Sequence, residues 1–312
     1  MKLSTRINRL FNQFSNFNVW KKAIILLAIA FVVFSVYHKS KPVVEGFAQN
    51  EKFVSKEGDD VYDAFYASIY DVLLSNNVKT HYEIGEIIKS TGMQTSSKVL
   101  DIGSRTGDVV QKLNTKNITA IGIDKHSSLV NFAKKKHEEN DYRSLNPMSS
   151  IIFPESYFTH ITALNFMIYT VENKQTFLQN CYMWLKPGGY LALHLVNRDK
   201  FDPILSASNP ISFVSPQKYA KKRITNSVIK FENFSYTANY EPDNANDKAY
   251  FHEKVVDDKT NNVRKNKHIL YMPTQETILT KAKNVGFIMK SKIDLVHCEY
   301  EYQYVYVLYK PS

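Results

Sequence analysis

The stretch VLDIGSRTGDVV, residues 99–110, decides the fold of this chain. An apolar run typical of a buried β-strand ends at Asp101 and Ile102, and the chain then turns through Gly103 and Gly107 before a helix begins. Glycines at such a turn accept a positive φ and let the backbone come close to a ligand. In open parallel sheets the ligand lies beyond the carboxyl ends of the strands, so this turn predicts one wall of a binding cleft.

On both sides of this turn, short apolar runs alternate with segments of helical periodicity. Strands are expected at 98–102, 119–124, 158–164 and 190–196, and helices at 61–74, 81–90, 108–113, 127–139 and 174–185. Strands separated by helices of this length imply right-handed crossovers and a mostly parallel sheet. We therefore predict an α/β, Rossmann-like fold with helices on both faces of the sheet.

The last third of the chain has a different pattern. Its β-rich segments are joined by polar turns, which predicts an antiparallel β insertion at about 227–271. A helix is expected at 274–284, closed by Gly286, and strands at 293–308 end the chain. Residues 61–312 are thus predicted to form one folded domain.

Composition excludes several classes of protein. The chain has 312 residues, of which 44% are hydrophobic and 22% charged, as in ordinary globular proteins and unlike disordered or multi-pass membrane chains. Its two cysteines, Cys181 and Cys298, lie far apart, which argues against a disulfide scaffold and a structural zinc site. The net charge is +10, and much of the excess comes from the first 44 residues, which contain no acidic side chain.

The N-terminal region is predicted to be a membrane anchor with its flanks. A basic segment at 1–22 precedes fifteen uncharged residues at 23–37, AIILLAIAFVVFSVY, and a polar linker follows at 38–60. We expect the apolar run to form a single short transmembrane helix, with flanking lysines that reach the headgroups. A cleaved signal peptide and a mitochondrial presequence are the alternatives. Three basic residues on each side leave the orientation and the membrane open.

The carboxylate beside the glycine turn bears on the choice of ligand. Dinucleotide sites use G-x-G-x-x-G with a pyrophosphate at the helix start, whereas here the spacing is G-x-x-x-G and Asp101 stands two residues before Gly103. A carboxylate there would repel a pyrophosphate but suits the ammonium and sulfonium groups of S-adenosylmethionine. Asp124 closes the next strand, where it could accept hydrogen bonds from a ribose diol. A nucleotide-dependent oxidoreductase, or an ordinary glycine turn beside a capped aspartate, remains the alternative.

Three stretches in order resemble the motifs of class I S-adenosylmethionine-dependent methyltransferases of the small-molecule type (type 11/25-like). They are VLDIGSRTG, AIGIDKHSSLVNFAKKK and FPESYFTHITALNFMIYTVENKQTFLQNCYMWLKPGGYLAL, and the resemblance covers roughly residues 61–200. It implies a seven-stranded sheet, S-adenosyl-L-methionine as cofactor and transfer of a methyl group. Looser similarity to the glycine N-methyltransferase branch lies in NRDKFDPIL, RITNSVIKFENFSYTANY, HILYMPTQETILTKAKNVGF and YVYVLYKP, so nitrogen is slightly favoured over oxygen as acceptor.

The resemblance also assigns the residues that would bind the cofactor. They surround its methionine, ribose, adenine and methyl-donor parts in turn: Asp101, Gly103 and Gly107; Asp124; Asp141 and Tyr142; Leu164 and Asn165. Tyr66 and Tyr70 lie on the helix that folds over the cofactor in this family.

Two residues depart from the family pattern. Arg105 stands where the family has its middle glycine, and Thr159 replaces the acidic residue usual before the fourth strand. We expect the Arg105 side chain to point away from the cofactor, because it would otherwise oppose the sulfonium charge. The two departures leave open a non-catalytic, membrane-tethered scaffold with a degenerate methyltransferase fold.

A general base is needed only if the acceptor arrives protonated. The candidates are Tyr169, after the fourth strand, and His194, near the end of the fifth strand. His252 and His268 belong to the inserted region and could form a lid. No metal-ligand spacing occurs, and the basic clusters are interpreted as solvated faces, which disfavours nucleic acid as a partner. The predicted substrate is a small-molecule or lipid-associated acceptor, and the oligomeric state stays open.

Overall fold

The computed structural model describes residues 17–39, 51–208 and 215–312, in two units, Met1–Val44 and Glu45–Ser312. In the first unit, helix α2 (Val19–Lys39) contains the anchor predicted at 23–37, and most of the predicted basic segment lies outside the described residues. No helix in these described ranges is both long and apolar enough to cross a membrane.

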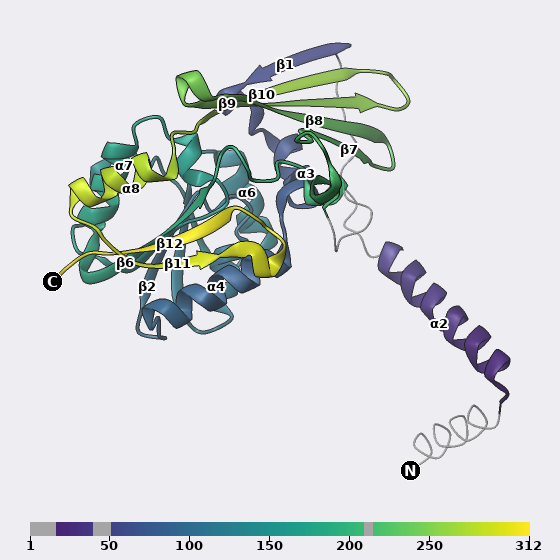
Figure 1. The fold of residues 1–312 in the computed structure, drawn as a ribbon, viewed down its shortest axis with the longest axis horizontal. Helices are drawn as coiled ribbons and strands as arrows, with labels where there is room; N and C mark the ends of the chain where they lie inside the picture. The colour runs from purple at the N-terminus through teal and green to yellow at the C-terminus, as the bar shows by residue number, and fades with distance from the viewer. Residues whose placement is uncertain (1–16, 40–50, 209–214) are drawn as a thin grey trace. The chain divides into compact units, whose positions relative to one another are not determined.

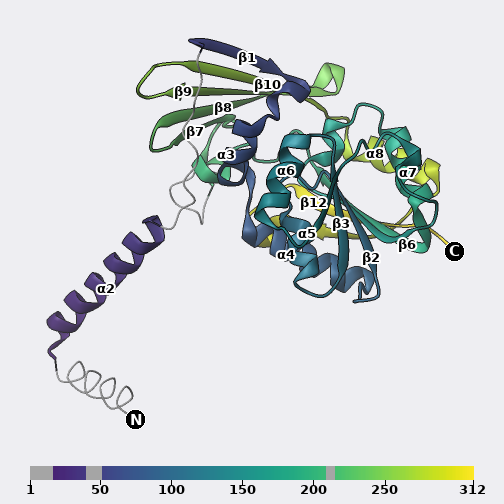
Figure 2. The same cartoon turned by 180° about the vertical axis from the view of Figure 1, so that it is seen from behind.

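The second unit is built on a seven-stranded sheet, as predicted, with the order β11-β12-β6-β5-β2-β3-β4 (Figures 1 and 2). Its strands are β2 (Lys98–Ile102), β3 (Thr119–Asp124), β4 (Asp141–Ser144), β5 (Phe158–Ala163), β6 (Leu185–Val196), β11 (Ile288–Asp294) and β12 (Gln303–Tyr309). Strands β6 to β4 are parallel, and β12 pairs antiparallel with both of its neighbours. The carboxyl ends of β2, β3 and β5 therefore meet at one edge of the sheet.

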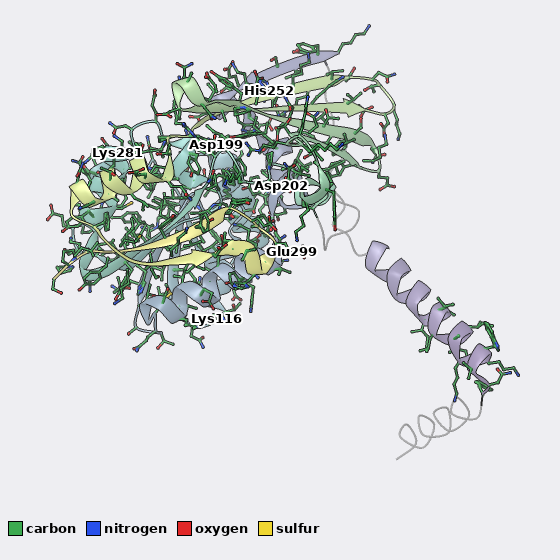
Figure 3. The ribbon with its side chains drawn as sticks, in the orientation of Figure 1. Lys116, Asp199, Asp202, His252, Lys281 and Glu299 are labelled. Atoms are coloured by element: carbon green, nitrogen blue, oxygen red, sulfur yellow. The ribbon has the colours of Figure 1, made fainter. Side chains whose placement is uncertain are left out.

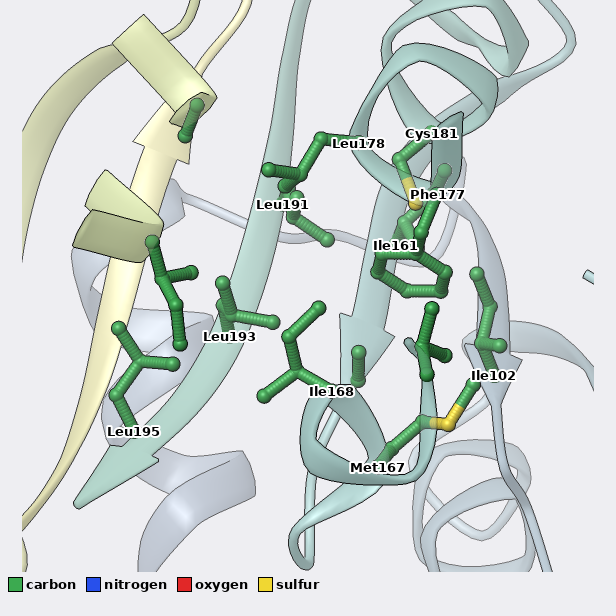
Figure 4. Packing of buried hydrophobic residues seen from close by; sticks show 14 of the residues in the cluster. Ile102, Ile161, Met167, Ile168, Phe177, Leu178, Cys181, Leu191, Leu193 and Leu195 are labelled. Atoms are coloured by element: carbon green, nitrogen blue, oxygen red, sulfur yellow. The ribbon is translucent and has the colours of Figure 1, made fainter. Parts of the chain in front are cut away.

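Helices cover both faces of this sheet. Their bounds are α4 (Asn77–Thr91), α5 (Asp108–Asn114) and α6 (Ser127–Lys136) on one face, and α7 (Lys174–Trp184) and α8 (Gln275–Val285) on the other. The α7 face packs Phe177, Leu178 and Cys181 against the apolar side chains of β5 and β6 (Figure 4). These side chains are fully buried, so both cores hold the sheet rigid beneath its carboxyl edge.

A second sheet has the order β1-β10-β9-β8-β7. Its strands are β1 (Phe53–Glu57), β7 (Asn226–Lys230), β8 (Phe234–Asp243), β9 (Lys248–Asp257) and β10 (Val263–Tyr271), so the antiparallel insertion predicted at about 227–271 is confirmed. The predicted linker at 38–60 is wrong at its end, because residues 53–57 form β1 and pair in parallel with β10. The short, charged β1 sequence gave no strand signal, and its partner lies far along the chain.

Helix α3 (Ala64–Leu74) lies beside this second sheet in both ribbon views (Figures 1 and 2). Asp63 caps α3 by accepting a hydrogen bond from the Tyr66 amide, and its carboxylate pairs at 2.7 Å with the buried Arg264 of β10. The described residues also form short 3₁₀ segments: η1 (Gly58–Val61), η2 (Ser150–Ile152), η3 (Met167–Thr170), η4 (Ser206–Ser208), η5 (Pro216–Tyr219), η6 (Asn244–Asn246) and η7 (Leu295–Cys298). The second sheet thus fixes the start of the helix that borders the site.

Candidate active site

The turn after β2 has the backbone that its glycines predicted. Gly103 has φ 71° and Gly107 φ 92°, and the Gly103 amide donates a 2.8 Å hydrogen bond to the carbonyl of Ile123. A Cβ on Gly103 would lie 2.8 Å from Cγ of Met167, so a side chain there has no room. Arg105, between the two glycines, takes φ 52° and keeps the glycine-like backbone of the turn.

Asp101, at the end of β2, is a nearly buried carboxyl group. Thr162 donates a 2.6 Å hydrogen bond to it from β5. Burial raises the pKa of Asp101 to about 7, the Thr162 hydrogen bond opposes this, and the charge of Asp124 raises it further. The group therefore titrates near neutral pH.

Asp124, at the end of β3, is an ionised carboxylate at the same edge. It accepts hydrogen bonds from the backbone amides of His126 (3.0 Å) and Arg105 (3.2 Å), and its Oδ1 lies 2.8 Å from Nδ1 of His126. Burial raises its pKa, but the His126 hydrogen bond and the Arg105 charge outweigh it, so the pKa lies below the ordinary value. The two carboxylates flank the glycine turn.

Three hollows converge at this turn. The Asp124 groove, of about 420 Å³, is lined by Gly103, Asp124, Lys125, His126, Asn146, Pro147, Met148 and Met167, among others. The Asp101 cavity is lined by Ser75, Asp101, Gly103, Ser104, Thr106, Leu164 and Asn165, among others. The aromatic cavity, of about 180 Å³, is lined largely by Tyr62, Tyr66, Tyr70, Phe166, Phe201, Tyr240, Phe251 and His268. Arg105 lines all three.

The Arg105 side chain enters the cleft, so the expectation that it points away is wrong. Its Nη2 donates a 3.2 Å hydrogen bond to the carbonyl of Asn165, and the guanidinium carbon lies 5.4 Å from the centre of the Tyr70 ring. These partners lie inside the cleft, which explains its direction. Its Nε is buried without a hydrogen-bond partner, so the guanidinium retains an unused donor at the junction of the three hollows.

Most residues predicted to bind the cofactor meet around these hollows. Those that line them are Tyr66, Tyr70, Asp101, Gly103, Asp124, Leu164 and Asn165. Gly107 does not line them and is the N-cap residue of α5. Lys79 donates hydrogen bonds of 2.7 Å both to the Asn165 side chain and to the buried Glu83, which holds Asn165 in place.

Asp141 and Tyr142 lie outside the hollows. The Tyr142 ring is buried beneath the glycine turn, and its hydroxyl donates a 2.8 Å hydrogen bond to the carbonyl of Gly107. Asp141 is exposed and forms an ion pair with Arg143. The structure therefore does not bring them into the cleft as adenine-binding residues. His126 and Met148 border the Asp124 groove instead.

The two candidate bases are both packed away from the cleft. Tyr169 is fully buried, and its hydroxyl accepts a 2.9 Å hydrogen bond from the Val196 amide. His194 is fully buried as well: Nδ1 accepts from the Phe166 amide at 3.2 Å, and Nε2 lies 3.1 Å from the side-chain oxygen of Gln303. Burial also holds the pKa of His194 well below its ordinary value. Neither group is available to an acceptor.

Tyr62 and His268 border the aromatic cavity. Tyr62 has no role in the predictions from sequence, which give His268 only a place in a lid. Tyr62 falls within the helix predicted at 61–74, but in the structure it follows η1 and precedes α3, so its place in the cleft depends on η1. The sequence of β10 contains a signal for His268. Arg264, Asn266 and His268 are buried and alternate with the more accessible Lys265 and Lys267, so three polar groups lie on the buried face. Thr159 has a structural role, since its hydroxyl accepts a 2.9 Å hydrogen bond from the Lys98 amide at the start of β2.

Comparisons with known proteins find similarity to methyltransferases. Residues 100–193 match the family model of the methyltransferase domain. A phosphoethanolamine N-methyltransferase of Plasmodium falciparum is 30% identical over 151 residues, 47% of this chain and 54% of that protein. A ubiquinone/menaquinone biosynthesis C-methyltransferase of Vibrio vulnificus is 28% identical over 135 residues, 40% of this chain and 51% of that protein. The chain thus spans about half the length of the curated relatives it matches.

Solved structures extend the likeness to the whole fold. The CcbJ methyltransferase of Streptomyces caelestis superposes with a TM-score of 0.61 at 12% identity, covering 81% of this chain and 99% of that one. The domain therefore has the fold of these methyltransferases.

Proposed function

We propose that this chain is an active methyltransferase that transfers a methyl group from S-adenosylmethionine to a small-molecule acceptor. The observation that carries the proposal is the pair of carboxylates, Asp101 and Asp124, on either side of the glycine turn where three hollows meet. The donor supplies a methyl group already activated by positive sulfur, so the chain mainly has to align two molecules and exclude water.

The residues present fit this donor. Asp101 offers a carboxylate to an ammonium group, and Asp124 remains ionised to accept hydrogen bonds from a ribose diol. His126 and Met148 also line the Asp124 groove, and the apolar Met148 side chain suits contact with an adenine ring. Arg105 is the one of these residues that does not fit the donor, because its positive charge lies at the junction of the hollows and would repel a sulfonium.

The acceptor is proposed to be a small amine. The name of the Plasmodium relative supports nitrogen, and the loose likeness to the glycine N-methyltransferase branch, which stays a prediction, points the same way. The aromatic cavity also suits a cationic product, because tyrosine and phenylalanine rings attract ammonium groups. Oxygen acceptors and lipid-associated acceptors remain the other members of the predicted class.

Calorimetric titration of the full chain with S-adenosylmethionine and S-adenosylhomocysteine tests the donor site. We expect micromolar binding in the wild type and loss of binding in Asp124→Ala. Asp141→Ala, outside the cleft, is the matched control and should bind like the wild type. A folded chain that binds neither compound would contradict the proposal.

One observation favours a second candidate, the non-catalytic scaffold. The Arg105 side chain occupies the junction of the three hollows and donates to the Asn165 carbonyl there. In a scaffold this arrangement would be permanent, and the domain would act through its surface. Donor binding by the wild type speaks for the enzyme. Binding that appears only after Arg105→Gly speaks for the scaffold.

Membrane attachment through 23–37 also stays a proposal. It is supported by the uncharged run and by the exposed apolar side chains of α2, among them Trp20, Ile24 and Leu27. We would compare flotation of the full chain and a chain lacking residues 1–39 with vesicles containing anionic lipid. Flotation of the full chain alone supports attachment, and equal behaviour of both contradicts it.

A further inference from the structure

The insertion contributes a buried acid–base cluster to the cleft. Glu253, on β9, is 3% exposed and accepts hydrogen bonds from four donors. These are the hydroxyl groups of Tyr66 and Tyr236, the side-chain amide of Asn266 and Nε2 of His268. Burial opposes the charge of this carboxylate, but His268 and the other donors keep its pKa below the ordinary value. The carboxylate is therefore ionised.

The hydrogen bonds around Glu253 fix the state of the His268 ring. Arg264 donates to the side-chain oxygen of Asn266 at 2.8 Å, so the Asn266 nitrogen faces Glu253 at 2.8 Å. The same carboxylate oxygen of Glu253 lies 3.0 Å from Nε2 of His268, which consequently carries a proton. In the neutral ring, Nδ1 is then a free acceptor.

Nδ1 of His268 faces the cleft through Tyr62. The Tyr62 hydroxyl lies 3.2 Å from Nδ1 and is positioned to donate its proton there. The Tyr62 ring stacks on His126, with centroids 4.0 Å apart, and it lines both the aromatic cavity and the Asp124 groove. The Tyr62 phenol therefore lies between the aromatic cavity, where we place the methyl acceptor, and the Asp124 groove, where we place the methyl donor.

The charged groups that face Tyr62 oppose one another. Burial raises the pKa of its phenol, the charge and hydrogen bond of Arg105 lower it, and the carboxylates of Asp124 and Glu253 raise it. A phenolate formed transiently at this position would be stabilised by Arg105. This also gives the arginine at the glycine position a use in an active enzyme.

We propose that Tyr62, His268 and Glu253 form a proton relay that deprotonates the methyl acceptor, an ammonium or hydroxyl group bound in the aromatic cavity. The acceptor gives its proton to Tyr62 Oη while the tyrosine's own proton moves to Nδ1 of His268. The resulting imidazolium is held by Glu253. The freed lone pair forms the new bond to the methyl carbon, the carbon–sulfur bond breaks, and its electrons stay on sulfur. The proton leaves His268 for water after the product departs. The inference rests on the proposed methyltransferase function.

A test that needs no acceptor is nitrogen NMR of the ¹⁵N-histidine-labelled full chain, with His268→Gln identifying the signals of this ring. From the hydrogen bonds of the ring we expect a proton on Nε2, none on Nδ1, and a shift of the Nδ1 signal in Tyr62→Phe. His252→Gln, on the outward-facing side of the same sheet (labelled in Figure 3), should leave the His268 signals unchanged. A proton on Nδ1, or no response to Tyr62→Phe, overturns the relay.

Kinetics with phosphoethanolamine, and with small amines and alcohols as further probes, give the second readout. Tyr62→Phe and His268→Gln should lower kcat by about 10²–10⁴-fold while the affinity for S-adenosylhomocysteine changes little. His252→Gln, on the outward-facing side of the same sheet, is again the control and should keep the kcat of the wild type. A kcat within threefold of the wild type in Tyr62→Phe overturns the relay. Absent donor binding in the wild type would instead count against the proposed function.

Discussion

The guanidinium of Arg105 donates a 3.2 Å hydrogen bond to the backbone carbonyl of Asn165, across the mouth of the cleft. One residue belongs to the turn after β2 and the other follows β5, so this bond joins the ends of two neighbouring strands. It occupies the place where three hollows meet. Any ligand that spans them has to displace this contact or pair with the arginine.

Arg105→Gly should increase the affinity for S-adenosylmethionine about tenfold, which corresponds to roughly 1.4 kcal/mol. The substitution removes a positive charge that opposes the sulfonium, and glycine adopts φ 52° without strain. Calorimetry measures the change, with Arg105→Lys as the control that keeps the charge. Weaker binding by Arg105→Gly would mean that the guanidinium pairs with the donor rather than opposing it.

The affinity for the donor should fall about tenfold between pH 8 and pH 6. Burial raises the pKa of Asp101 to about 7, so its carboxylate is mostly ionised at the higher pH and mostly protonated at the lower. The ionised form attracts the donor's ammonium group. Titrations across this range measure the slope.

The matched variant for this pH dependence is Asp101→Asn, which should bind weakly and without a slope. The effect of pH on the stability contributed by Asp101 has the opposite sign to its effect on donor affinity. A carboxyl group whose pKa is higher in the folded than in the unfolded chain binds more protons when folded, so its contribution to stability declines as pH rises from about 4 to about 7. Donor affinity that rises on acidification would contradict this role of Asp101.

His194→Phe should destabilise the fold without changing donor affinity. The phenyl ring keeps the volume but leaves the Phe166 amide and the Gln303 side chain without their partner in a fully buried place. We expect the free energy of unfolding to fall by about 1–3 kcal/mol, measured by urea denaturation. A stable variant that binds the donor but cannot transfer methyl would restore His194 as a base.

The sequence predicted those strands and turns whose residue pattern is contained in one continuous segment. The strand that ends at Asp101, its glycine turn and the antiparallel insertion all have their signal within a few residues of sequence. The neighbours of Tyr169 and His194 depend on which side of β6 and η3 faces the core, which no single segment reveals. Tyr62 and His268 meet only because η1 packs on the inner face of the second sheet.

The same limit applies to Tyr142. The family resemblance assigned it to the adenine, but the structure buries it under the turn, with its hydroxyl 2.8 Å from the Gly107 carbonyl. The glycine turn at the proposed donor site therefore packs on the buried Tyr142 ring. This predicts a large effect for a small change at Gly107.

Gly107→Ala should cost more stability than Gly188→Ala. Both glycines have positive φ, 92° and 79°, so both substitutions strain the backbone. A Cβ on Gly107 would in addition lie 2.5 Å from the Tyr142 hydroxyl oxygen, whereas a Cβ on Gly188 meets nothing within 4 Å. We expect a difference of about 1–3 kcal/mol in the free energy of unfolding, from overpacking alone.

The double variant identifies the clash as the cause. In a Tyr142→Ala background, Gly107→Ala has room, so its cost should fall toward that of Gly188→Ala, and the two residues should show a coupling energy. Denaturant titrations of the four chains of this cycle measure it, and donor titrations of the same chains should rank in the same order. Additive effects would mean that the strain at Gly107 is confined to its own backbone, and Tyr142 would then have no part in shaping the donor turn.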